Sequence, residues 1–244
     1  MTCAICEERK EKRFCPAVHG KICPQCCGEQ REVTLDCPSD CPYLQQAREH
    51  ANAHTELSGN RDLETWFSEL EIPPLEVPEQ FLYEREELIL GLSFALAKGA
   101  RGDRSLVDRS LVDRSLVDRS LLDRDLIAAL GALVKTYHTM VNSGLIYEPT
   151  TANLAHQAVV RNVAREVETM VREFRQEEQQ HTGHTRLGDS DVLKALAFLL
   201  RLGLGRTSGR PKSRAFVDFL LAQFPEKHPS VIGPEEPASR IVIP

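Results

Sequence analysis

The chain has 244 residues, of which 41% are hydrophobic and 27% charged, as is typical of a soluble globular protein. Its 30 basic and 36 acidic residues give a formal net charge of -6, so no overall positive field favours generic nucleic-acid binding. The sequence has no apolar run of about 18 residues, and charged residues dominate the first fourteen positions, where a signal peptide would be apolar. We therefore predict a folded cytoplasmic protein that does not enter the membrane.

The cysteines are confined to the start of the chain. All eight lie between Cys3 and Cys41, and with one histidine they form closely spaced groups: Cys3 and Cys6; Cys15 and His19; Cys23, Cys26 and Cys27; Cys37 and Cys41. Two ligands separated by two or three residues can be presented by one tight turn to a tetrahedral ion. Four such pairs predict two zinc ions. Sites closed by four protein ligands leave no position for a substrate, so we expect structural metal and no enzymatic activity.

Clustered cysteines have two other common uses, in disulfides and in iron–sulfur clusters. Disulfides belong to oxidising compartments, and no export signal is seen. An iron–sulfur cluster also takes thiolates, and four of the cysteines precede a proline, as the last ligand of bacterial ferredoxins does. The spacing of those ferredoxins is absent, so zinc is favoured, with an iron–sulfur electron-transfer or sensing protein as the alternative.

Nine candidate ligands compete for eight positions. Adjacent Cys26 and Cys27 diverge, so each can serve a different ion, which gives two all-cysteine sites. Alternatively, Cys27 is a spare buried thiol and His19 completes the second site. The spacing leaves both arrangements open.

The order of these pairs resembles the small double-zinc modules of the MYND and HIT finger type. The likeness covers residues 1–54 only. It implies a cross-brace, with Cys3, Cys6, Cys23 and Cys26 on one ion and Cys15, His19 or Cys27, Cys37 and Cys41 on the other. The chain departs from the pattern because such modules usually end in a histidine–cysteine pair, whereas Cys37 and Cys41 come last here. The resemblance implies docking to a protein partner, as such modules are generally scaffolds.

The rest of the chain is predicted to be helical, which gives a mostly α protein with a small cysteine-rich module. Residues 55–79 contain a proline-rich linker with an aromatic anchor at Trp66 and Phe67. Apolar periodicity then predicts a helical domain over 80–224, followed by a mobile tail over 225–244. The expected helices span 83–98, 121–141, 153–179, 191–204 and 211–224, with Gly144 as a C-cap and Asp189 or Ser190 as an N-cap.

Two segments within the helical domain stand out. Residues 103–127 are five copies of a pentamer, which we interpret as a tandem duplication extending the next helix, because 25 residues are too few for a β-solenoid. Residues 153–179 carry an apolar seam through Val160, Val163 and Val167 that would pack on another helix of this chain or of a second copy in a homodimer.

The basic connection 206–214 resembles part of an AT-hook around Gly209, Arg210 and Pro211, although Ser208 replaces the first arginine of that core. DNA binding through it is disfavoured by the opposing net charge and is a second alternative. The main prediction is a zinc-binding scaffold or regulatory protein that acts through protein–protein interaction.

Overall fold

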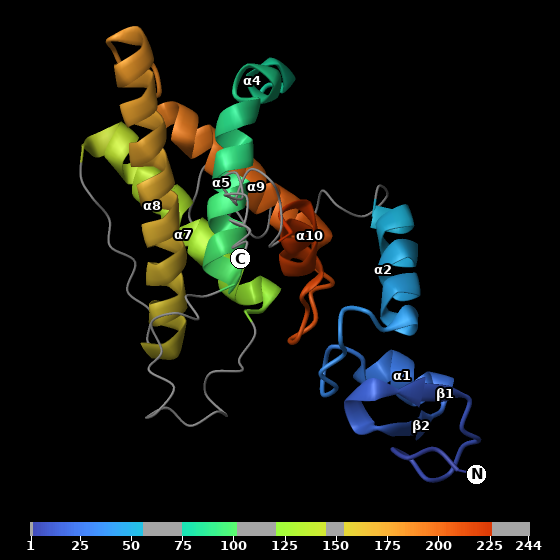
Figure 1. The fold of residues 1–244 in the computed structure, drawn as a ribbon. Helices are drawn as coiled ribbons and strands as arrows, with labels where there is room; N and C mark the ends of the chain where they lie inside the picture. Colours follow the sequence, from blue (N-terminus) through green and yellow to red (C-terminus); the bar gives the residue numbers. More distant parts are fainter. Residues whose placement is uncertain (1, 56–74, 102–120, 145–153, 226–244) are drawn as a thin grey trace, which may run out of the picture.

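The computed structural model describes residues 2–55, 75–101, 121–144 and 154–225, and the mostly α prediction is confirmed (Figure 1). The cysteine module comprises β1 (Arg13–Cys15), the 3-10 helix η1 (Pro16–Val18), β2 (Gly20–Ile22), α1 (Pro24–Gln30) and α2 (Pro42–Thr55). The helical domain comprises α4 (Glu79–Glu84), α5 (Glu86–Arg101), α7 (Asp123–Ser143), α8 (Leu154–Thr182), α9 (Asp189–Arg206) and α10 (Ala215–Gln223).

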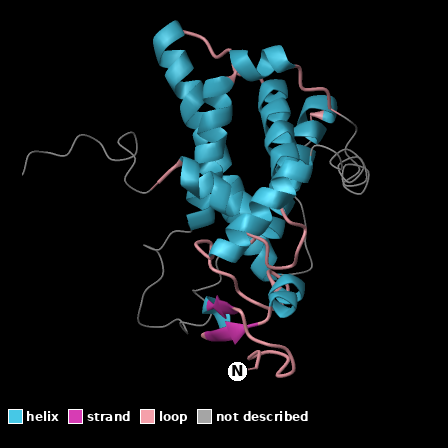
Figure 2. Cartoon of the chain, turned by 90° about the vertical axis from the view of Figure 1, so that its right-hand side faces the viewer, coloured by secondary structure: helices cyan, strands magenta, loops and turns pink. Residues whose placement is uncertain are grey.

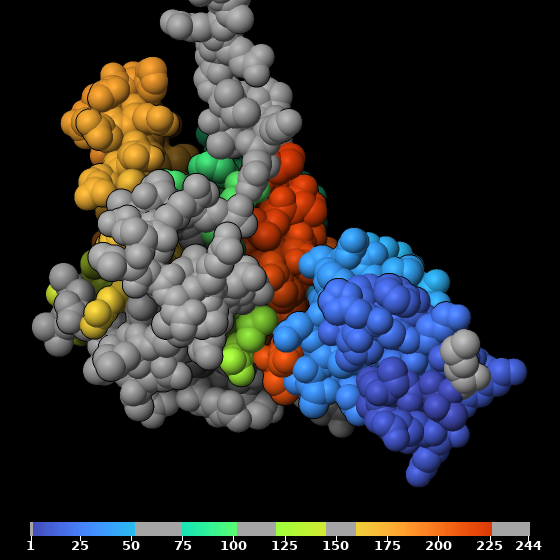
Figure 3. Space-filling model, turned by 60° about the horizontal axis from the view of Figure 1, so that its bottom comes forward, coloured from blue at the N-terminus to red at the C-terminus, as the bar shows by residue number. Residues whose placement is uncertain are grey.

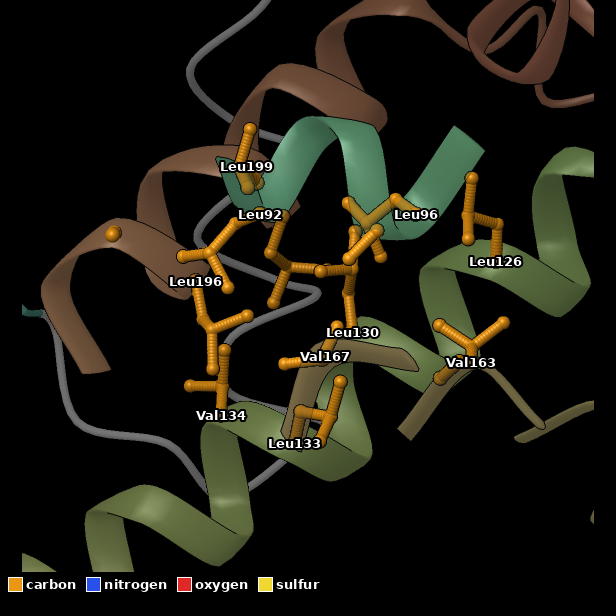
Figure 4. Close-up of a cluster of buried hydrophobic side chains, with 14 of the residues drawn as sticks. Leu92, Leu96, Leu126, Leu130, Leu133, Val134, Val163, Val167, Leu196 and Leu199 are labelled. Carbon is orange, nitrogen blue, oxygen red and sulfur yellow. The ribbon is translucent and has the colours of Figure 1, made fainter. Parts of the chain in front are cut away.

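The helical domain is held by one apolar core. Helix α7 packs against α8 and α9, while α5 packs against α8, α9 and α10. Figure 4 shows leucines and valines from these helices meeting between the ribbons: Leu92, Leu96, Leu126, Leu130, Leu133, Val134, Val163, Val167, Leu196 and Leu199. Burial of each such side chain stabilises the fold by about 1.5–3 kcal/mol.

The seam of α8 belongs to this core. Val160, Val163 and Val167 are buried within the chain, and Met170 and Phe174 pack partly against the same cluster. Of the two arrangements the seam allows, the structure shows packing within the chain.

One of the two predicted helix caps is confirmed and the other is wrong. Gly144 ends α7 with a φ of 68°, as expected of a C-cap glycine. The predicted N-cap of α9 is wrong, because the helix begins at Asp189 after Gly188, which makes no side-chain cap. The carboxylates of its first turn bind arginines instead: Asp189 accepts from Arg175 at 2.6 Å and Asp191 from Arg85 at 2.8 Å.

Helix α10 begins at Ala215, four residues after the predicted start at Pro211. The reason lies in α7, whose buried Asp123 accepts the backbone N–H groups of Phe216 and Val217, both at 3.0 Å. Asp123 also accepts the Ser213 hydroxyl at 2.7 Å. A carboxylate supplied by another helix thus caps α10 and fixes where it begins.

Some expectations fall on residues that are not described. They are the aromatic anchor at Trp66 and Phe67, the pentamer copies before residue 121 and the tail from residue 226. The short hairpin of β1 and β2 was not predicted, since two strands of three residues carry too little alternation to be recognised. None of the described helices is long and apolar enough to cross a membrane.

The crossing of α9 over α10 predicts a sharp difference between two glycines. A Cβ at Gly203 would lie 2.8 Å from Cε1 of Phe216, a buried ring that cannot withdraw. We expect Gly203→Ala to lower the free energy of unfolding by about 1–3 kcal/mol in urea denaturation. Gly91→Ala is the control, because its Cβ would meet only the flexible end of Met170. An equal loss in both variants would contradict this packing account.

Candidate metal centre

Four cysteines from two parts of the module form a compact cluster. The sulfur atoms of Cys3, Cys6, Cys23 and Cys26 all lie within 4.8 Å of one another. Cys3, Cys23 and Cys26 are 0%, 2% and 3% exposed, and Cys6 is half-buried. This is the first and third pair together, the grouping that the cross-brace resemblance implies. Four thiols at this separation could hold one metal ion.

Local backbone structure explains how the cluster forms. Cys3 and Cys6 lie in a turn closed by the N–H of Glu7, which donates to the carbonyl of Cys3 at 2.9 Å. Glu7 itself has a φ of 58°, which lets the chain reverse. The second pair lies where β2 ends and α1 begins: Cys23 is the N-cap of α1 and Cys26 lies in its first turn. The hairpin and the helix thereby bring two turns face to face.

Backbone donors surround the sulfur atoms. The N–H of Cys23 donates to Cys3 Sγ at 3.1 Å, and the N–H of Cys26 donates to Cys23 Sγ at 3.4 Å. Burial opposes ionisation of Cys3, but backbone hydrogen bonds from Cys6, Cys23 and Ile5 outweigh it and lower its pKa to about 6. Burial raises the pKa of Cys26 to about 12, so this thiol gives up its proton only to a strong competitor such as a metal ion.

A nearby arginine was missed by the sequence analysis. Burial works against the charged form of Arg9, but the charges of Cys6, Cys23 and Cys26 outweigh it and raise its pKa. The guanidinium therefore offsets part of the negative charge that thiolates would bring. The spacing of metal ligands cannot identify Arg9, because this residue interacts with the thiolates through its charge and does not bind the ion.

The remaining four cysteines lie around a second, smaller space. Cys15, Cys27, Cys37 and Cys41 line one cavity of about 10 Å³, with Ile22, Leu35 and Leu44 among its apolar walls. The volume is near the minimum that a single water requires. In the described part of the chain, only the first cluster has every sulfur within 4.8 Å of the others. The second set of cysteines lines one cavity, but its sulfur atoms do not all lie within 4.8 Å of one another.

Cys27 and His19 are placed differently. Cys27 is buried and lines the second cavity, while its neighbour Cys26 belongs to the first cluster. Successive helical residues point about 100° apart, so α1 presents one thiol to each group. His19 is exposed, has a φ of 49° as the C-cap of η1, and is not among the residues lining the cavity. The structure thus places Cys27 with the other three cysteines.

All eight cysteines are free thiols. All of them lie within the described residues 2–55, and no two of them are bonded there, which gives the disulfide interpretation no support.

The module docks onto the helical domain through a buried charge. Glu32 is 3% exposed and accepts Arg48 at 2.9 Å and the Ser208 hydroxyl at 2.9 Å. Arg48 also pairs with Asp218 of α10 at 2.8 Å. In Figure 2 the hairpin lies at one end of the helices, and Figure 3 shows the blue module against red α10.

The basic connection 206–214 takes part in this contact. Arg210 donates to the carbonyls of Gly28 and Arg31 at 2.9 and 2.6 Å. Lys212 donates to the Thr34 carbonyl at 2.8 Å and pairs with Asp36 at 2.9 Å. These acceptors all lie between Cys27 and Cys37, so two of the cations expected to face nucleic acid bind the module.

No protein-family model, curated protein or solved structure matches the chain. The resemblance to MYND and HIT fingers therefore rests on the ligand grouping alone, and what is established is a cluster of four cysteines that could hold a metal ion.

Proposed function

We propose that the chain is a zinc-binding scaffold or regulatory protein that acts through protein–protein interaction, with two structural ions in the cysteine module. The first ion is assigned to Cys3, Cys6, Cys23 and Cys26, and the second to Cys15, Cys27, Cys37 and Cys41. The observation that carries the proposal is the first cluster, in which four thiols, three of them buried, lie within 4.8 Å of one another. Four thiolates complete a tetrahedral zinc site and leave no open position for water or substrate.

A structural role also follows from how little apolar surface the module buries. Its cluster of buried residues consists of Ile22, Leu35 and five of the cysteines themselves. A segment of this size needs a further source of folding free energy, and metal binding supplies it.

Exposed apolar side chains support docking to a protein. Phe14 of β1 is 57% exposed, and Val18 and Val33 of the same module are 37% and 39% exposed. Phe14 lies one residue before Cys15, so the metal-dependent hairpin would present it. Aromatic side chains held on a rigid element are common anchors of protein interfaces.

Removal of the metal tests the proposal. In reducing buffer with a chelator, we expect proteases to cut residues 2–55 while the helical domain resists, because only the module depends on metal. Mass spectrometry of the fragments gives the cut sites, and added zinc should restore resistance. A module that stays resistant after its metal content has been measured as zero would exclude the structural role.

An iron–sulfur cluster would use the same thiols, and the absorption spectrum of the purified protein distinguishes it from zinc. Zinc has a filled d shell and gives a colourless protein, whereas a cluster gives a brown protein that dithionite bleaches. DNA binding through 206–214 is the less favoured alternative, since Arg210 and Lys212 already bind carbonyls of the module.

A further inference from the structure

A groove lies where the cysteine module meets the helical domain. Its volume is about 390 Å³, within the range of small-molecule sites. One wall comes from the module and the other from the end of α9 and the segment that leads into α10. The module contributes Arg31, Glu32 and Arg48 to the lining, and the helical domain contributes Arg206, Thr207 and Arg210.

The groove concentrates positive charge in a chain whose net charge is -6. Four arginines line it, and Glu32 is the single carboxylate among the lining residues. Glu32 and Asp218 both pair with Arg48, which leaves Arg48 neutralised. In the described ranges, no carboxylate pairs with the other three arginines. Arg31, Arg206 and Arg210 therefore line one space without a carboxylate partner, and Arg31 also lines the second cysteine cavity.

These three guanidinium groups are held in place by neutral partners. Arg31 donates to the Tyr43 carbonyl at 3.1 Å, and Arg210 donates to two carbonyls of the module. Arg206 stacks over the ring of Phe219, with 4.0 Å from its central carbon to the ring centre. A guanidinium has five N–H donors, so each keeps donors for a ligand while its position is already fixed. Little side-chain entropy would then be lost on binding.

From this arrangement we infer that the groove binds a small phosphate-bearing molecule. Three cations without a carboxylate partner match an anion with more than one charge, and the guanidinium fork matches phosphate oxygens. The hydroxyl of Thr207 accepts the Gly209 N–H and keeps its own proton to donate to a phosphate oxygen. The apolar wall, which includes Leu44, Ala47 and Ala51, would contact the organic part of the ligand.

A small molecule fits better than nucleic acid. A nucleic-acid backbone needs a row of cations along an open surface, whereas Lys212 of the same connection is paired with Asp36 of the module. Arg31, Arg206 and Arg210 instead line one groove between two parts of the chain. This inference does not depend on zinc being the metal or on a protein partner.

Calorimetric titration of the full, metal-loaded chain with phenyl phosphate at pH 8 and low salt tests the inference. We expect saturable binding of one molecule per chain, with phenol giving none. Arg206→Gln should weaken binding by about tenfold or more, since it removes one charge-assisted contact. Ala51→Glu, which places a carboxylate on the groove wall, should weaken it at least as much.

Two controls separate a specific site from general charge. Arg172→Gln removes an exposed arginine of α8, and Gln46→Glu adds a carboxylate to α2 outside the groove lining. Both should bind phenyl phosphate like the unchanged chain. Helical circular dichroism and metal content confirm that every variant is folded. The inference fails if no saturable binding occurs, if the groove variants bind like the controls, or if an oligothymidine binds more tightly than phenyl phosphate.

Discussion

Replacement of Cys26 by serine is expected to abolish the first metal site. Cys26 lies in the first turn of α1 and its sulfur is within 4.8 Å of the other three cysteines of the cluster. Loss of partners that only orient a ligand lowers metal affinity 10- to 100-fold, so loss of a ligand should cost at least about 100-fold. The measurement is zinc affinity by competition with a coloured chelator, with the folding of residues 2–55 followed by hydrogen exchange.

Two further variants make this result specific. Cys27→Ser should release one ion while the first cluster keeps its own, because Cys27 lines the second cavity. His19→Ala should retain both ions, because His19 is exposed and lies outside that lining. If His19→Ala loses an ion and Cys27→Ser does not, the second site is built from the histidine instead.

Asp123→Ala should destabilise the helical domain more than any other single substitution outside the core hydrophobics. The carboxylate is 1% exposed and serves the N–H groups of Phe216 and Val217 and the hydroxyl of Ser213. Alanine would leave these buried donors without an acceptor. We expect the free energy of unfolding to fall by about 3–5 kcal/mol in urea denaturation at constant zinc.

Asp123→Asn is the matched control. Its carbonyl oxygen can still accept from both backbone N–H groups, and its amide can donate to the Ser213 oxygen. The loss should then stay below about 1.5 kcal/mol, because only the charge is removed. An equal loss in the two variants would mean that the negative charge, and not the set of hydrogen bonds, holds the start of α10.

The cysteine pairs that form the first cluster were predictable, because the spacing of two ligands in one turn is encoded locally. A turn that presents two thiols needs only a few residues, so the spacing of Cys3 with Cys6 and of Cys23 with Cys26 carries the signal by itself. The choice between His19 and Cys27 could not be made in this way. It depends on which way each side chain points from the hairpin and from α1, and that is set by the fold of the whole module.

The contact between the module and the helical domain was not predicted. Glu32 and Arg48 look like ordinary surface residues in a sequence with 66 acidic and basic side chains in total. Their partners in the helical domain lie far along the chain: Glu32 accepts the Ser208 hydroxyl, and Arg48 pairs with Asp218. The same holds for Asp123, which reads as one copy of a repeated aspartate yet fixes the start of α10. Contacts between residues so far apart in the chain produce no periodic pattern in the sequence.

The central claim is that the amino-terminal thiols hold two zinc ions with a purely architectural role. Its most direct test is native mass spectrometry, paired with elemental analysis, of chain purified without added metal. The account predicts two zinc ions per chain and a colourless solution. A ratio of one, iron in place of zinc, or a folded module without any metal would contradict it.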